Sequence, residues 1–154
     1  MRPTASTADR LSALQALVAR DGVGLGGLPA AQQSLALALV WSGLPAGAVV
    51  DEREVNLWLK AQLAGAAAFL DTDHVELRRW LVDAGWLWRD GYGREYRPMA
   101  VADLAAGQRM LAESVHAALG GLGTAAWVTE QRARHRARRE ARRREWQASR
   151  GPAA

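Results

Sequence analysis

The chain has 154 residues, of which 49% are hydrophobic, enough for one domain with extensions and a core of its own. It contains no cysteine, which excludes a disulfide framework and a thiolate metal site. The net charge of +4 is unevenly distributed, because residues 130–154 hold nine Arg and three Glu (9 − 3 = +6), so the remainder sums to 4 − 6 = −2. The basic character therefore belongs to the C-terminal segment.

The N-terminal region predicts an amphipathic helix over about residues 7–20, with Leu11, Leu14 and Leu17 interleaved with charged residues. This pattern differs from the unbroken apolar core of a signal peptide. The longest apolar run, Leu35–Trp41, is too short to span a membrane. We therefore expect a cytoplasmic protein that does not bind membranes.

The run Gly22–Gly27 predicts a flexible linker. Its glycines only approximate a dinucleotide-binding fingerprint, and no strand precedes them. Beyond it, Ala30–Ser42 predicts a deeply buried helix that ends at Gly43. A third helix is expected to begin at Asp51, three residues before Glu54, a spacing typical of a capping box.

A fourth helix is predicted from Asp73, with Gly85 as its stop signal. Two short strands, 86–89 and 94–97, then flank the turn sequence Asp-Gly-Tyr-Gly. A helix followed directly by a β-hairpin is typical of a winged-helix domain, in which this helix holds the recognition position. The expected fold class is mainly α with a small β-hairpin (α+β), winged-helix-like, with helical extensions at both ends.

Two motifs carry a resemblance to a known family. VVDEREVNLWLK (Val49–Lys60) followed by LRRWLVDAGWLWRDGYGREYR (Leu77–Arg97) resembles the bacterial family called domain of unknown function 2087. The matching positions are Glu52, Glu54, Val55, Asn56, Leu77, Arg78, Arg79, Leu81, Val82, Asp83, Leu87, Arg89, Tyr96 and Arg97. The resemblance covers roughly residues 34–99 and implies a winged-helix-like fold associated with transcription regulators.

Two further helices are predicted after the hairpin, over about residues 100–119 and 124–150, separated by Gly120–Gly123. The last one is Arg-rich and predicts a solvated helix with no apolar face of its own, supported by i,i+4 Glu–Arg pairs. The expected organisation is an N-terminal helix and linker (1–28), a winged-helix-like domain (29–99), an accessory helix (100–123) and an Arg-rich tail (124–154).

Several arginines are candidates for nucleic-acid contact, since a guanidinium group matches both phosphate and guanine. Arg78 and Arg79 have the competing interpretation of salt bridges, such as Arg79–Asp83 within one helix. A four-residue turn would place Arg89 opposite Arg94, an arrangement more easily explained if an anion lies between them, whereas a two-residue turn would remove this pairing. The full set of candidates is Arg78, Arg79, Arg89, Arg94, Arg97, Arg134, Arg138, Arg139, Arg142 and Arg143.

Trp80 and Trp88 are candidate interface residues. The tryptophans of this region cannot all fill one small core, and leaving two of them in water is unfavourable, since a buried Trp removes about 150–250 Å² from solvent. We therefore expect an accessory helix of the same chain, or a second copy of the chain, to cover them.

No catalytic, metal or cofactor site is predicted. His74, His116 and His135 lie on separate segments, and no nucleophile elbow or phosphate loop is present. The preferred interpretation is a winged-helix DNA-binding, transcription-regulatory protein whose tail adds sequence-independent phosphate contacts. The alternatives are a protein-interaction module, with a protein partner or a homodimer, and an RNA- or ribosome-binding tail on a scaffold domain.

Overall fold

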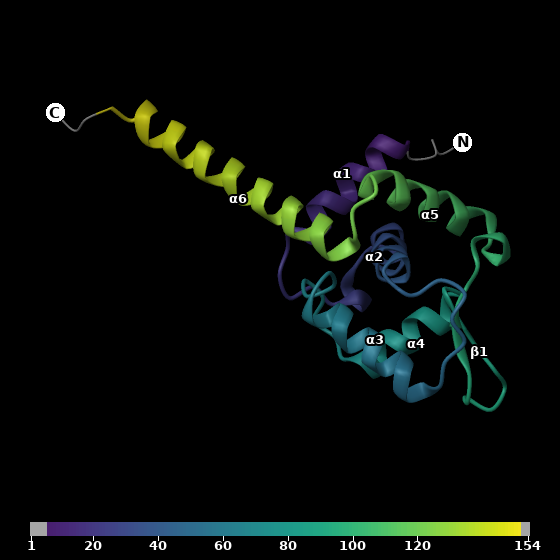
Figure 1. Ribbon diagram of the computed structural model, residues 1–154. Coiled ribbons are helices and arrows are strands. Elements are labelled where there is room, and N and C mark those ends of the chain that lie inside the picture. Colours follow the sequence, from purple (N-terminus) through teal and green to yellow (C-terminus); the bar gives the residue numbers. More distant parts are fainter. Residues whose placement is uncertain (1–5, 152–154) are drawn as a thin grey trace.

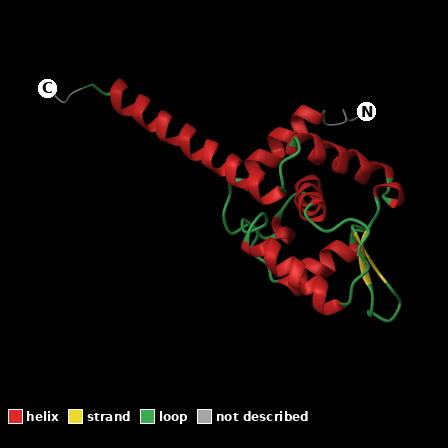
Figure 2. Cartoon of the chain, viewed as in Figure 1, coloured by secondary structure: helices red, strands yellow, loops and turns green. Residues whose placement is uncertain are grey.

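The computed structural model describes residues 6–151, which form six α-helices and one two-stranded hairpin (Figures 1 and 2). Of these described residues, 64% are helical, 3₁₀ turns included, and the predicted α+β class is confirmed. Two short 3₁₀ turns, Leu25–Gly27 and Val101–Asp103, connect these elements. The elements are α1 (Thr7–Val18), α2 (Ala30–Ser42), α3 (Glu52–Ala64), α4 (His74–Asp83), β1 (Leu87–Arg89), β2 (Tyr96–Pro98), α5 (Ala106–Leu119) and α6 (Thr124–Ser149).

Helix α2 lies at the centre of the fold, with α1 and α5 on one side and α3 and α4 on the other (Figure 1). Every residue from Leu35 to Val40 is buried, which confirms the deep burial predicted from its apolar sequence. A helix that is apolar on more than one face must be covered on more than one side. For this reason α2 organises the core and the other helices pack around it.

Both predicted helix starts in the middle of the chain are confirmed. The Asp51 carboxylate accepts the Glu54 N–H at 2.9 Å, and Asp73 accepts the Glu76 N–H at 2.8 Å. Each bond satisfies an N–H group that has no partner within its helix. After α4, Gly85 takes a left-handed φ of +85°, which only glycine adopts at little cost, and the chain turns into β1.

The hairpin pairs β1 antiparallel to β2, with Arg89 opposite Tyr96. The arrangement expected for a four-residue turn, with Arg89 opposite Arg94, is therefore wrong, because the connection spans residues 90–95. Asp90 Oδ1 shapes this loop by accepting the N–H groups of Arg94 at 2.7 Å and Glu95 at 3.2 Å. Desolvation opposes ionisation of this carboxyl, but the loop N–H groups outweigh it and lower the pKa of Asp90.

A third extended segment joins the hairpin. The Val50 N–H donates to the Tyr96 carbonyl oxygen at 2.9 Å, and the Tyr96 N–H donates back to Val50 at 2.8 Å. Between residues 30 and 98 the order is thus α2, the Val50 bridge, α3, a bridge from Leu70 to Val23, α4, β1 and β2. The Val50 bridge holds the start of α3 against the hairpin, and this fixes α3 and α4 relative to β2.

The segments on either side of residues 30–98 are in closer contact with the rest of the protein than the sequence predicts. The sequence predicted a flexible linker at the glycine run; here Val23 bonds to the segment before α4, since the Val23 N–H donates to Phe69 O at 2.9 Å and the Asp71 N–H donates to Val23 O at 2.8 Å. In α6, Trp127 and Val128 belong to the core, so the expectation of no apolar face is wrong for its first turns. Within residues 6–151, the helices include none with the length and apolar content needed to cross a membrane.

Candidate nucleic-acid interface

Arg78 on α4 is held by the protein's own side chains. Its Nη1 atom lies 2.5 Å from Asn56 Oδ1 and 3.0 Å from Glu52 Oε1, both on α3. Its guanidinium carbon also sits 5.6 Å from the ring centroid of buried Tyr96. Only 17% of the side chain is exposed. Arg78 therefore joins α3, α4 and β2, and these internal contacts favour the salt-bridge interpretation over phosphate contact.

The rest of the exposed surface of α4 is mainly acidic. Arg79 is exposed, but the expected pair between Arg79 and Asp83 is not among the ion pairs of the described residues. Asp73 and Glu76 lie in the cap and first turn of the same helix, and both are exposed. With Arg78 engaged by Glu52, acidic groups outnumber free cationic groups along this helix. That balance opposes close approach to a phosphate backbone.

The three hairpin arginines each lie against the hairpin itself. The Arg97 guanidinium covers the Trp88 ring at 5.0 Å, and that of Arg94 lies 5.7 Å from the Tyr92 ring. The Arg89 side chain runs along Gly93 of the loop, close enough that a Cβ there would meet its Nη2 at 2.7 Å. Arg78, Arg79, Asp83 and Arg89 also border a cavity of about 130 Å³ between α4 and the hairpin.

The two tryptophans proposed as interface residues are placed differently. Trp80 is half-buried and packs against the core. Trp88 is half-buried beneath Arg97, a cover from the paired strand that the sequence did not suggest. Trp86 is buried against Trp41, with ring centroids 5.5 Å apart.

Helix α6 is anchored to the body by its first turns. Arg132 Nη1 donates to the carbonyl oxygens of Val18 and Arg20, both at 2.9 Å, and its Nη2 donates to Asp21 Oδ1 at 2.6 Å. Val18 is the last residue of α1 and Arg20 lies just beyond it, where no intrahelical donor is available to their carbonyls. The Arg132 guanidinium thus ties α6 to the end of α1, near the point where α6 leaves the body (Figure 1).

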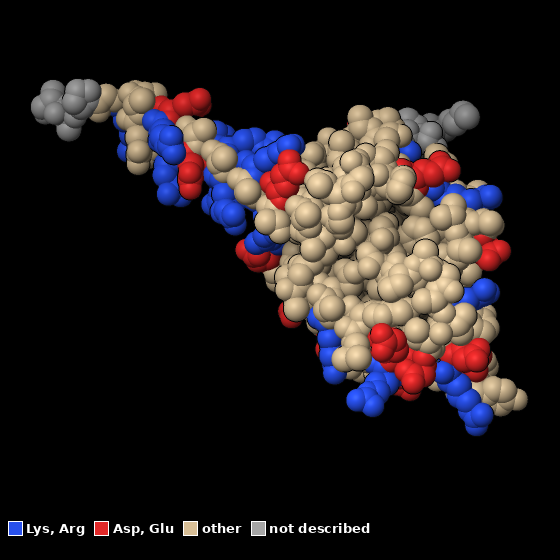
Figure 3. All heavy atoms as spheres, viewed as in Figure 1, with Lys and Arg blue, Asp and Glu red and all other residues tan. Residues whose placement is uncertain are grey.

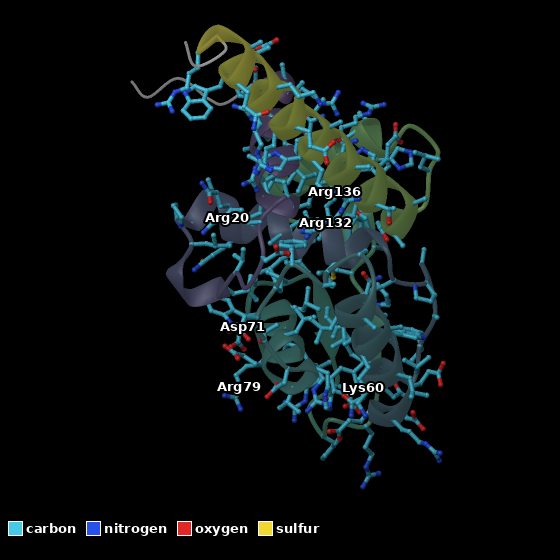
Figure 4. The ribbon with its side chains drawn as sticks, turned by 90° about the vertical axis from the view of Figure 1, so that its left-hand side faces the viewer. Arg20, Lys60, Asp71, Arg79, Arg132 and Arg136 are labelled. Atoms are coloured by element: carbon cyan, nitrogen blue, oxygen red, sulfur yellow. The ribbon has the colours of Figure 1, made fainter. Side chains whose placement is uncertain are left out.

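Beyond this anchor, α6 projects away from the body, and every residue from Arg136 to Arg150 is exposed. This stretch holds seven Arg and two Glu, a sum of 7 − 2 = +5. In Figure 3, basic atoms gather along the projecting helix, whereas the visible face of the body beside it is largely uncharged. Figure 4 labels Arg132 and Arg136 on α6, far from Arg79 at the other end of the molecule.

The helical period separates the charges of α6 by face. At 100° per residue, an arc of about 160° on α6 contains no acidic residue; besides the anchor Arg132, it holds five arginines of the helix. We call this the arginine face: Arg136, Arg138, Arg139, Arg142 and Arg143. None of the five forms an ion pair or hydrogen bond with any described residue.

On the opposite side of α6, glutamates of the same helix pair with the arginines and neutralise their charge. Arg134 pairs with Glu130, and Arg144 lies 3.7 Å from Glu140. Arg134 was a predicted site residue and lies on this neutralised side. Arg136 was missed, although helical periodicity alone places it on the arginine face. The structure therefore distinguishes unpaired from paired arginines. The number of arginines in the C-terminal segment does not make this distinction.

Residues 29–98 match the model of a family described as "Uncharacterized protein conserved in bacteria (DUF2087)". No curated protein and no solved structure was found to match the chain. The match spans α2 to β2 and contains both motifs that carried the sequence resemblance, which it confirms. That segment holds seven basic and nine acidic residues, 7 − 9 = −2, so the arginine face of α6 lies outside it.

Proposed function

We propose, on the premise that residues 29–98 are a domain of the DUF2087 family, that this protein binds nucleic acid through the arginine face of α6. The observation that supports it best is an acid-free arc of five unpaired arginines on a helix that projects from the body. Arginines that lack an internal partner are available to displace counterions from phosphates, and this displacement drives sequence-independent binding. The DUF2087 domain supplies the platform to which α6 is anchored.

The proposal moves the main contact away from α4. The order of elements in residues 30–98 supports a winged-helix interpretation, in which α4 would enter a DNA groove. Engagement of Arg78 by Glu52 and Asn56, together with the acidic neighbours of Arg79, argues against that use here. If the protein regulates transcription, any preference for a DNA sequence would have to come from Arg79 and the hairpin arginines. These residues would add little to the affinity for DNA.

The test is a salt titration on a labelled duplex of about 20 base pairs, followed by fluorescence anisotropy. If all five arginines of the face contact phosphates, the slope of log K against log salt is about −0.9 × 5, or roughly −4.5. The double variant R139Q/R143Q removes two of these contacts, so we expect the slope to become shallower by about 1.8.

A matched control comes from the other side of the same helix. The variant R134Q/R144Q removes the same charge, but these arginines are already paired with Glu130 and Glu140. We expect its slope to change by less than half as much. The proposal fails if the wild type shows no salt-dependent binding. It also fails if the two double variants make the slope shallower by the same amount, because the arginine face would then contribute no more than the paired arginines.

A second candidate function is protein binding by the DUF2087 domain, with α6 docking on an acidic partner. The net charge of −2 on residues 29–98 and the internal use of Arg78 favour it. Capture of partners from a lysate, with and without nuclease, separates the two. A partner that remains bound after nuclease treatment and depends on the body supports this second function.

A further inference from the structure

One tryptophan lies in the middle of the arginine face. The chain has seven tryptophans, and Trp146 is the one classed as exposed, with 56% of its surface open to solvent. At 100° per residue it falls between Arg142 and Arg139 in the helical projection. An exposed indole is unfavourable in water, and six other tryptophans of this chain are buried or half-buried.

The surroundings of Trp146 suggest what the ring is for. The Arg150 guanidinium lies 4.1 Å from its centroid, yet more than half of the residue remains accessible. No core residue is available to cover it, because every residue of α6 from Arg136 onward is exposed. An aromatic ring among unpaired cationic groups is the combination used to bind single strands, in which phosphates meet the cations and a base stacks on the ring.

We propose that α6 binds single-stranded nucleic acid in preference to duplex, with an unpaired base stacking on Trp146. This inference rests on the proposed function and specifies its substrate class. A base within a duplex already stacks on its neighbours and presents no free face, so Trp146 adds affinity only where bases are unpaired. Every base has a π-face, so the ring confers little sequence preference.

The experiment compares labelled oligo(dT) and oligo(U) of about 20 nucleotides with a duplex of the same length, at one salt concentration. Trp146→Ala removes the stacking surface, and we expect it to weaken single-strand binding by about 5- to 100-fold while duplex binding changes by less than about twofold. Trp146→Phe keeps an aromatic face and is expected to restore most of the single-strand affinity. The exposure of Trp146 means that neither change disturbs the core, which a thermal melt checks.

A second measurement reports on the ring directly. Oligo(dT) is expected to quench part of the tryptophan emission of the wild type, and this part is absent in Trp146→Phe. Comparing the affinities for oligo(dT) and oligo(U) shows whether the protein distinguishes deoxyribose from ribose. Binding to either strand supports the inference. Equal weakening of single-strand and duplex binding by Trp146→Ala, or no effect on either, overturns it. The salt slope of duplex binding still tests the arginine face separately, so loss of this inference leaves the proposed function standing.

Discussion

Replacing Arg78 tests whether this arginine holds the domain together or contacts a ligand. In the Arg78→Ala variant, Asn56 Oδ1 loses a charged donor at 2.5 Å, and hydrogen bonds to charged groups contribute about 1.5–3 kcal/mol. The Glu52 pair adds at most about 0.5 kcal/mol, because Glu52 is 54% exposed and solvent screens it. The contact with the Tyr96 ring adds about 0.5–1 kcal/mol.

These contributions share one side chain and do not simply add, so we expect a loss of about 2–3 kcal/mol in the free energy of unfolding. For a chain of this length that corresponds to a fall in Tm of roughly 5–10 °C. Urea unfolding followed by circular dichroism measures it. The control is Arg79→Ala on the same helix, expected to change stability by less than about 0.5 kcal/mol because Arg79 is exposed.

A double-mutant cycle with Asn56→Ala isolates the central contact. Residues in direct contact couple by about 0.5–3 kcal/mol, so the double variant should be more stable than the sum of the single effects predicts. Duplex affinity is expected to be unchanged in Arg78→Ala once its lower stability is allowed for. A coupling energy near zero, or a stable Arg78→Ala protein with much weaker duplex binding, would refute this reasoning and return Arg78 to the nucleic-acid interface.

Three other outcomes follow from the structure. Asp90 has a lowered pKa in the folded protein, so the stability that its ionised form provides is complete above the pKa of the unfolded state and is lost as pH falls through the pKa of the folded state. Asp90→Asn should therefore lower Tm at pH 7, and the difference in Tm from wild type should shrink in acid. Thermal melting at a series of pH values measures this difference. Trp127→Ala should cost about 3–5 kcal/mol in urea unfolding, whereas removal of residues 136–154 should leave the core stability unchanged; equal effects would mean that α6 is not divided into a docked and a free part. Gly43→Ala brings a Cβ within 2.2 Å of Gln62 Nε2 and should destabilise by about 1–3 kcal/mol, and an unchanged Tm would show that Gln62 swings aside without cost.

The sequence by itself determined the local elements and the fold class. Caps at Asp51 and Asp73, the stop at Gly85 and the apolar run of α2 act over a few residues, so their signals lie within one stretch of chain. The family motif likewise lies along the chain, and the match to residues 29–98 agrees with it. The concentration of positive charge at the C-terminus is also a property of composition alone.

Only the tertiary structure decided which charged and aromatic groups are free. Glu52 and Asn56 are more than 20 residues from Arg78, and the sequence has no signal that joins them until α3 packs on α4. The same is true of Arg132, whose partners at the end of α1 lie 111 to 114 residues away. A sequence does not distinguish one arginine from another. In the folded protein, an internal ion pair or hydrogen bond occupies the guanidinium group and leaves it unavailable to a ligand. For this reason the sequence placed the candidate site on α4 and the hairpin as well as the tail, whereas we propose the unpaired face of α6.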